Sequence, residues 1–376
     1  MKTTINLIIA SLFILFSFGC QKPMNCAHCI AYKNANVLTL KDDKILANHT
    51  VLISGDSIIA VLASDEFEGD FILSDSAIVD VQGAYIMPAL QEMHAHFEPL
   101  NTNHKHYKAY ERVPKTKYLQ LLKICKEKNI KLASHIPYEF CKDQDLDNLL
   151  DSELQCFEHL INFGAFVTSD SIKKVSAPDN TKYYGYDVIA NLDSLKVVDL
   201  VKKVKTKNIW MCPTSVLWTN PGDTTAINVL VKQKEFIRLD QGLRNWWLST
   251  KGDYARSQSA GVLNDILLKE LARQNVKILA GTDFPNPFLI PGYSLHQEIA
   301  NIARVGYGNL EALKSATVYP AQYWNEKRQT GHLEKGTKAN FIILDKNPLQ
   351  NIENTLSIQQ TVFNGQLYHK DKLLTR

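Results

Sequence analysis

The stretch Gly83–Phe97, GAYIMPALQEMHAHF, joins a short apolar run to a pair of histidines. Side chains alternate along a strand, so His94 and His96 would point to the same side of it. Two imidazoles held in this way can bind one metal ion, although an isolated pair of this kind is more often two ordinary surface or core histidines. The stretch therefore directs attention to other ligands that could meet at the end of the same strand.

The middle of the chain alternates between amphipathic helices and short apolar strands. Apolar residues at helical spacing begin at Tyr118, and a strand that ends at His135 follows them. The same order recurs before NIWMCPT at 208–214 and before VKILAGTD at 276–283. Repeated helix–strand units predict an α/β fold with a parallel sheet, of the TIM-type (β/α) barrel, in which the chemistry lies at the C-terminal strand ends.

Side chains able to bind a metal follow four of these strands. They are His94, His96, His135, His159 and Asp283. Each alone has an ordinary explanation, such as a hydrogen-bonded core histidine or a capping aspartate. Because the C-terminal strand ends of a barrel converge, the five together predict a divalent metal site with positions open to water.

Both ends of the chain have the pattern of antiparallel β-structure. Short β-rich runs alternate with turns from about Ile30 to Gln82, and Asn364–Gly365 predicts a hairpin turn near the C-terminus. We expect residues 30–84 and 331–376 to form one small β-sandwich domain. Residues 85–330 would then form the barrel, inserted between its two halves.

The first 20 residues are typical of an export signal. Lys2 precedes an apolar run at 7–18, which is too short for a comfortable membrane span. Gly19–Cys20 resembles the end of a bacterial lipobox, so we expect lipidation of Cys20; the alternative is an ordinary signal peptide cut elsewhere. The mature protein would be exported and held by its lipid anchor on a membrane, on the periplasmic or outer-membrane face.

Composition bounds the remaining function classes. The 376 residues are 45% hydrophobic and 22% charged, which indicates a folded protein with a full-sized core. The net charge of +3 does not favour a nucleic-acid partner. Cys26 and Cys29 are expected to form a short disulfide or two free thiols, and the cysteines in the apolar segments are expected to be core residues. The latter are Cys125, Cys141, Cys156 and Cys212.

Together these motifs resemble the metal-dependent amidohydrolases, most closely their imidazolonepropionase-like and prolidase-like branch. The resemblance runs from about Ile30 to Tyr368: GAYIMPALQEMHAH is similar to the first barrel strand, KLASHIP to the fifth, FEHL to the sixth and GTDFP to the eighth. Glu92 and Asn340 stand where the family usually has Asp. The resemblance implies hydrolysis of an amide or cyclic amide bond in a small or dipeptide-like substrate, with one or two divalent ions, zinc being the expected metal.

The resemblance also implies a role for each strand-end ligand. His94, His96 and Asp283 would hold one ion, and His135 and His159 would hold a second. A bound metal lowers the pKa of its water and polarises the scissile carbonyl. Asp283 would accept the proton of that water and deliver it to the leaving nitrogen.

Four further residues are weaker candidates. Lys108, in YKAY, resembles the fourth-strand lysine that bridges two metals when it is carbamylated; the equally weighted alternative is an ordinary barrel-wall or surface lysine. His104 and His106 lie in the polar stretch NTNHKH and are predicted to be loop histidines that bind no metal. His296 lies on a predicted helix after the eighth strand and is a weak substrate-side candidate.

The resemblance is interrupted by an apparent deletion. Only 39 positions separate His96 from His135, whereas three further strand–helix units of about 30 residues each would be needed there. The barrel would lack its second and third strands between residues 97 and 105, leaving an open edge, a contracted barrel or a gap that a second subunit fills. Six strands are recognisable, ending near His96, Tyr110, His135, His159, Pro213 and Asp283.

The deletion leaves two alternatives to an active hydrolase. One is a catalytically impaired, membrane-tethered binding lipoprotein on a degenerate amidohydrolase barrel, with one metal retained. The other is an imperfect gene model of a longer protein.

Overall fold

The computed structural model describes residues 23–96, 106–169, 186–219, 224–250, 254–326 and 329–370. The expected signal peptide with Cys20 lies outside the described residues, as does His104. In the part of the chain that is described, no helix is long and apolar enough to cross a membrane.

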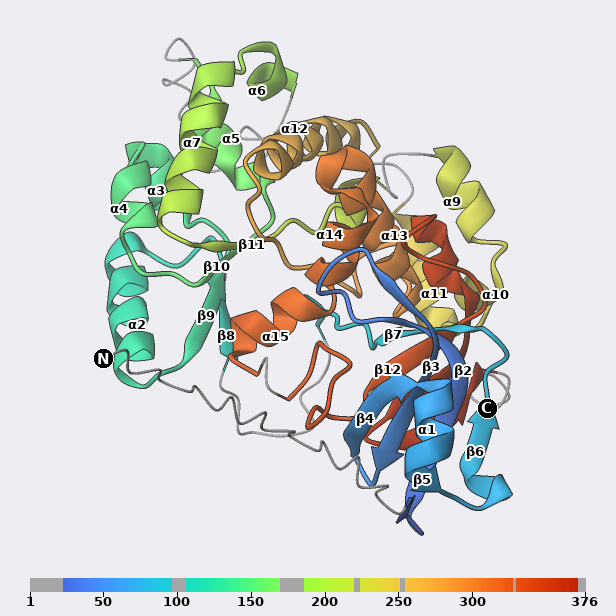
Figure 1. The fold of residues 1–376 in the computed structure, drawn as a ribbon. Coiled ribbons are helices and arrows are strands. Elements are labelled where there is room, and N and C mark those ends of the chain that lie inside the picture. Colours follow the sequence, from blue (N-terminus) through green and yellow to red (C-terminus); the bar gives the residue numbers. More distant parts are fainter. Residues whose placement is uncertain are drawn as a thin grey trace, which may run out of the picture.

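The two ends of the chain meet in one mixed eight-stranded sheet (Figure 1). Its path runs β14-β13-β12-β7-β2-β3-β4, and β6 pairs with β2. The strands are β2 (Cys29–Leu38), β3 (Ile45–Ser54), β4 (Ser57–Ala63), β6 (Ile78–Asp80), β7 (Tyr85–Pro88), β12 (Phe341–Leu344), β13 (Ile358–Phe363) and β14 (Gln366–His369). The predicted hairpin turn is confirmed, because Asn364 and Gly365 both have positive φ between β13 and β14.

This sheet differs from the expected β-domain at one boundary. β7, which we assigned to the barrel, pairs with β2 and with β12 and so belongs to the terminal sheet. The four residues of β12 are all buried, which explains its uninterrupted apolar sequence FIIL. Hydrogen bonding joins the strands into a single sheet, and the two-layer sandwich stays a prediction.

Small elements cover one end of this sheet. Cys26 and Cys29 form the disulfide that was one of the two expected states. The same N-terminal part of the chain also contains a two-stranded sheet and short helical segments. They are β1 (Met24–Asn25), β5 (Phe71–Ile72), α1 (Ser64–Asp70) and the 3-10 turn Asp75–Ala77.

The middle of the chain forms a parallel four-stranded sheet in the order β11-β10-β9-β8. Its strands are β8 (His106–Ala109), β9 (Lys131–Ser134), β10 (Cys156–Glu158) and β11 (Trp210–Cys212). Two isolated parallel bridges continue the arrangement: Met211 pairs with Ile278, and Ala95 pairs with Phe284. The segments that carry the predicted ligands therefore follow one another around the same central region.

Helices lie on the outer side of this parallel sheet and cover it (Figure 1). The helices predicted from Tyr118 onward and before residues 208–214 are confirmed as α2 (Lys115–Glu127) and α7 (Ser194–Thr206). Asp193 caps α7 by accepting hydrogen bonds from the backbone N–H groups of Leu195 and Lys196. The others on this side are α3 (Tyr138–Asp143), α4 (Leu146–Leu150), the 3-10 turn Ile161–Phe163, α5 (Gly164–Val167) and α6 (Tyr186–Ala190).

The remaining helices follow β11. The helix predicted before residues 276–283 is confirmed as α12 (Tyr254–Arg273). The others are α8 (Val216–Thr219), α9 (Thr224–Leu230), α10 (Lys234–Ile237), α11 (Gln241–Ser249), α13 (Tyr293–Ile302), the π-helical turn Ala303–Tyr307, α14 (Gly308–Ser315), α15 (Val318–Trp324) and the 3-10 turn Ile352–Ser357.

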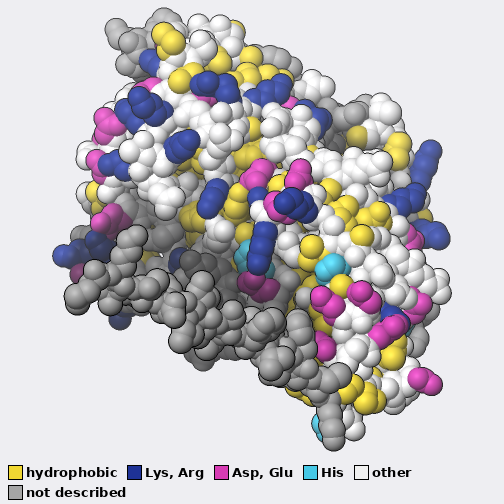
Figure 2. Space-filling view, viewed as in Figure 1, with side chains coloured by type: hydrophobic (Ala, Val, Ile, Leu, Met, Phe, Trp, Pro, Cys, Tyr) yellow, Lys and Arg dark blue, Asp and Glu magenta, His cyan; other side chains and the backbone are white. Residues whose placement is uncertain are grey.

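The core around the parallel sheet is continuous and apolar. It includes the four cysteines predicted to be core residues; all four are buried, and none of them forms a disulfide. On the face shown in Figure 2, basic and acidic side chains are interspersed, as expected from the small net charge.

Candidate metal centre

All five strand-end ligands predicted from the sequence lie together. Asp283 Oδ1 is 2.9 Å from His94 Nε2 and 2.8 Å from His96 Nε2, and Asp283 Oδ2 is 3.7 Å from His159 Nε2. The ring of His135 is 4.5 Å from that of His159, centroid to centroid. Side chains from four strand ends thus converge on one point, as the fold predicts for the C-terminal ends of parallel strands.

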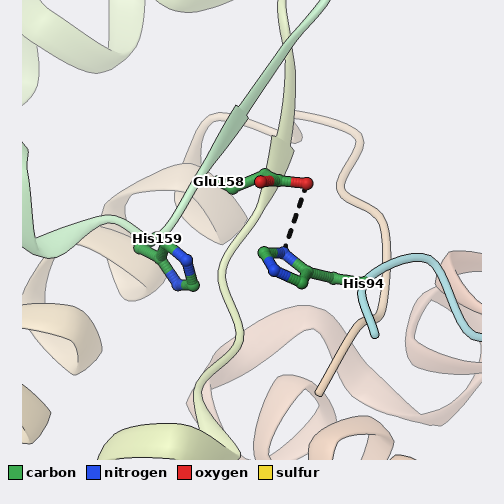
Figure 3. A group of neighbouring side chains, drawn as sticks. All are labelled: His94, Glu158 and His159. Carbon is green, nitrogen blue, oxygen red and sulfur yellow. Dashed lines mark ion pairs between the residues drawn. The ribbon is translucent and has the colours of Figure 1, made fainter. Parts of the chain in front are cut away.

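Backbone conformation at these strand ends aims the side chains inward. His159, Thr214 and Asp283 each adopt positive φ, at 63°, 48° and 68°. Along a regular strand, neighbours such as Glu158 and His159 would point to opposite sides. The left-handed conformation of His159 instead turns both into the centre, where they lie beside His94 (Figure 3).

Two of the histidines are oriented as metal ligands usually are. His135 Nδ1 lies 2.6 Å from Glu111 Oε2, and His159 Nδ1 lies 2.6 Å from Thr214 Oγ1. In each ring Nε2 is left to face the centre, and His135 Nε2 is buried with no hydrogen-bond partner among the described residues. Metal-bound histidines typically pair their other ring nitrogen with such an oxygen, so these residues fit a divalent ion.

The charge state of the cluster suits the same role. Burial alone would raise the pKa of Asp283, but hydrogen bonds from His94 and His96 outweigh it and hold the pKa well below its ordinary value. Burial lowers the pKa of His159 well below its ordinary value, so its imidazole is neutral. An ionised carboxylate and a neutral imidazole are the forms that bind metals.

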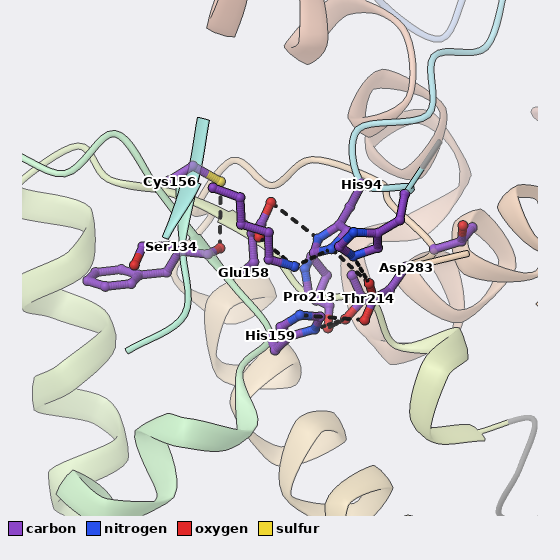
Figure 4. Close-up of polar contacts among 12 residues, drawn as sticks. His94, Ser134, Cys156, Glu158, His159, Pro213, Thr214 and Asp283 are labelled. Atoms are coloured by element: carbon purple, nitrogen blue, oxygen red, sulfur yellow. Dashed lines mark hydrogen bonds and ion pairs between the residues drawn. The ribbon is translucent and has the colours of Figure 1, made fainter. Parts of the chain in front are cut away.

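Glu158 is a member of the cluster that the sequence analysis missed. Its side chain is buried, with Oε1 3.2 Å from His94 Nδ1 and Oε2 3.2 Å from Lys108 Nζ (Figure 4). Lys108 Nζ is also 2.7 Å from His94 Nε2. Two overlapping sets of ligand atoms, each within 4.8 Å, could hold a metal: His94 with His96 and Asp283, and His94 with Glu158 and His159.

A signal for Glu158 was present in the sequence. It ends the three-residue strand CFE, in which every residue is buried. An ionisable side chain at the end of a fully buried strand is costly unless charged or polar groups meet it there. The strand-end rule selected His159 as the candidate ligand of this strand, and Glu158 was not predicted.

The Glu92 side chain connects the segment that carries His94 and His96 to the segment that carries Asp283. Its Oε1 accepts hydrogen bonds from the backbone N–H groups of His94, at 3.0 Å, and Thr282, at 2.8 Å. Its Oε2 accepts one from Thr282 Oγ1 at 2.9 Å. Burial raises the pKa of Glu92. The residue that departs from the family pattern therefore orients the backbone next to two ligands.

Gly281 lets the same two strands approach. A Cβ atom at this position would lie 2.6 Å from His94 Cβ and 2.7 Å from Cys212 Sγ. Both distances are shorter than real carbon contacts allow. The glycine of the GTD motif is thus required by close packing against a ligand histidine.

A cavity of about 530 Å³ opens beside the cluster. Four of the five predicted ligands line it together with aromatic, apolar and amide side chains. The lining residues are His96, Lys108, Tyr110, Glu111, His135, His159, Ile161, Asn162, Leu217, Trp218, Trp246, Asp283, Pro285 and Asn286. The arrangement can hold a small substrate with one group directed at the metal ligands.

Two weaker candidates lie elsewhere. His296 is on α13, as predicted, but it is not among the residues that line this cavity. The loop prediction for His106 is wrong, because His106 is the first residue of β8 and its ring packs against Tyr323 and Trp324. His106 belongs to neither of the two candidate ligand sets among the described residues.

Comparison with known families and structures agrees with this geometry. Residues 81–368 match the sequence profile of the amidohydrolase family. No curated protein matches the chain at a significant level.

Many solved structures share the fold at low sequence identity. A Xaa-Pro dipeptidase with methionine bound in its active site is 12% identical, with a TM-score of 0.60, over 91% of this chain and 100% of that one. A prolidase complexed with N-methylphosphonate-L-proline is 14% identical, with a TM-score of 0.62, over 91% and 99%. The bottromycin amidohydrolase is 14% identical, with a TM-score of 0.63, over 93% and 88%.

Proposed function

The chain belongs to the amidohydrolase family, a family of hydrolases of carbon–nitrogen bonds, and from this premise we propose that it is a metal-dependent hydrolase of amide or cyclic amide bonds. The observation that carries the proposal is the meeting of four histidine side chains with the Asp283 carboxylate, beside a cavity that His96, His135, His159 and Asp283 line. Zinc is the expected ion, because imidazole and carboxylate are its usual ligands at catalytic sites.

The ligands divide into two groups around His94 and Asp283. His94, His96 and Asp283 would hold one ion, and His135 and His159 would hold a second. Lys108 is close enough to His94 to take part if its neutral amine adds CO2 and becomes a carbamate. Glu158 supplies a carboxylate at the same place without any modification.

The metal, when bound, would activate water and polarise the scissile carbonyl. The chain's own residues would then move the proton. The Asp283 carboxylate, which lies between His94 and His96, would accept a proton and later give it to the leaving nitrogen. The aromatic and apolar side chains that line the cavity would hold the substrate beside the buried carboxylate.

Hydrolysis of a panel of dipeptides and N-acylated amino acids, by zinc-loaded and metal-stripped protein, tests the proposal. We expect turnover that requires the metal. Asp283→Asn should lower kcat by at least about 100-fold while the protein still unfolds cooperatively. Wild-type turnover in Asp283→Asn would refute the assignment of the proton to this residue.

We further propose that the protein is exported and anchored by a lipid at Cys20. The signal-like residues 1–20 support this, and the disulfide between Cys26 and Cys29 suits an oxidising compartment. Mass spectrometry of the mature N-terminus would test it: a diacylglyceryl group on Cys20 is expected, and a different cleavage site without lipid would contradict it.

The interrupted barrel favours one second candidate, an impaired hydrolase that binds its ligand without turning it over. The described residues show six barrel segments, and β8 has no backbone-paired neighbour in that part of the chain on the side of His94. Metal binding without turnover of any amide would support this candidate.

A further inference from the structure

The outer wall of the cavity carries two tryptophans on different helices. Trp218 lies on α8 beside Leu217, and Trp246 lies on α11. Both line the same cavity as four of the five predicted ligands. An aromatic wall of this kind gives a large contact area to an apolar group at little cost in conformational entropy.

Trp218 is fixed directly next to a ligand. Its ring lies edge-on to that of His159, with the centroids 6.4 Å apart. The first residue of α8 is held in place, because the backbone N–H of buried Val216 donates a hydrogen bond to Glu298 Oε2 at 2.7 Å. A group held against Trp218 would therefore lie within reach of the reacting centre.

Trp246 is placed by its neighbour in the sequence. Trp247 is fully buried, packs against Phe236 and Phe288, and donates from Nε1 to the backbone oxygen of Pro285 at 3.0 Å. Pro285 lies two residues after Asp283, so this hydrogen bond connects α11 to the segment that carries Asp283. Trp246, one residue earlier, remains 47% exposed on the cavity side.

Trp246 leaves apolar surface in contact with water in the cavity, and a bound apolar group would remove that surface from water. We propose that Trp246 and Trp218 form a specificity subsite for a large apolar, preferably aromatic, side chain of a neutral amide substrate. The subsite deepens the proposed function and rests on it for the reaction, whereas binding at the subsite can be measured without turnover.

The direct test compares the binding of two neutral probes, N-acetylphenylalaninamide and N-acetylglycinamide, to the purified protein by titration calorimetry. The probes differ only in the aromatic group. We expect the phenylalanine probe to bind at least about tenfold more tightly, since burying such a group is worth more than one tenfold step in affinity.

Variants on α11 distinguish a loss of the subsite from a general loss of binding. Trp246→Ala should remove most of the preference, and Trp246→Phe should keep most of it. Leu248→Ala is the matched control, because Leu248 is 39% exposed on the same helix but does not line the cavity, and the preference should persist. Equal binding of the two probes to the wild-type protein, or an undiminished preference in Trp246→Ala, would overturn the inference.

The two proposals can fail separately. If no amide is hydrolysed but the preference is present and lost in Trp246→Ala, the subsite stands and the hydrolase assignment falls. If amides are hydrolysed with equal kcat/KM for phenylalanine and glycine members of one dipeptide series, the hydrolase assignment stands and the subsite falls.

Discussion

The segment that bears His94 and His96 has neighbours on two sides, and they are held in different ways. On one side its backbone pairs with residues 280–284, through hydrogen bonds to and from His94 and His96. On the other side, toward β8, the described contacts join side chains: Lys108 Nζ to His94 Nε2 at 2.7 Å, and Tyr110 Oη to His96 Nδ1 at 3.4 Å. The deletion predicted between residues 97 and 105 would therefore fall on one side of the candidate site, and the side that supplies Asp283 is built by backbone pairing.

This difference indicates where the site tolerates change. Backbone hydrogen bonds fix the distance between two strands, whereas long side chains can follow small movements. Substitutions on the paired side should therefore shift the ligands more than substitutions toward β8. The predictions below test this ranking.

Gly281→Ala should have the largest effect, because its Cβ would collide with His94 Cβ and Cys212 Sγ on the paired side. Displacement of His94 by a fraction of an ångström should lower metal affinity and kcat/KM by at least about 100-fold. Zinc titration and steady-state kinetics measure the change. Gly69→Ala, where an added Cβ meets nothing within 4 Å, is the control, and near-normal zinc affinity in Gly281→Ala would contradict the account.

Lys108→Met should destabilise the protein by about 2 kcal/mol, because it leaves the buried Glu158 carboxylate without its cation. Adding Glu158→Gln should recover at least half of the loss, since the uncompensated charge is then removed. Urea unfolding of the two single variants and the double variant gives the coupling. If the double variant loses as much as the two single changes added together, the pair does not interact as described.

Glu92→Gln should weaken zinc binding by about 10- to 100-fold, because the carboxylate orients the backbone at His94 and Thr282. The variant keeps the shape of the side chain, so the loss reports the hydrogen bonds rather than packing. A competition titration against a chelator measures it. Unchanged affinity would show that backbone pairing alone positions the ligands.

The smallest effect is expected at Glu298, a buried carboxyl behind α8 whose pKa burial raises to about 8. In the unfolded chain this group titrates at about 4.3, so its protonated form stabilises the fold fully below that pH, and this stability is lost as pH rises through 8. Between pH 6 and pH 7 the wild-type protein should lose about 1–2 kcal/mol more than Glu298→Gln. Parallel pH profiles of the two proteins in urea unfolding would contradict the assignment.

The sequence predicted which side chains meet at this site better than it predicted what holds them there. His94, His96, His135, His159 and Asp283 could be predicted because strand ends meet in a parallel barrel, and that rule needs only the order of helices and strands. The left-handed conformation that turns both Glu158 and His159 inward leaves no such periodic signal, so Glu158 was missed.

Two other differences have separate causes, one local and one long-range. His106 follows a polar stretch and begins a strand of only four residues, which is too short to show an alternating pattern. β7 was assigned to the barrel because it leads into the histidines, yet its backbone groups pair with strands from both chain ends. Long-range pairing of this kind cannot be read from a single run of sequence.

Inductively coupled plasma mass spectrometry of the purified protein, beside the His94→Ala/His96→Ala double variant, would show whether the cluster binds a divalent metal. We expect one or two divalent ions per chain in the wild-type protein and a near-complete loss in the double variant. A wild-type protein that binds no divalent ion even after reconstitution with zinc would contradict it.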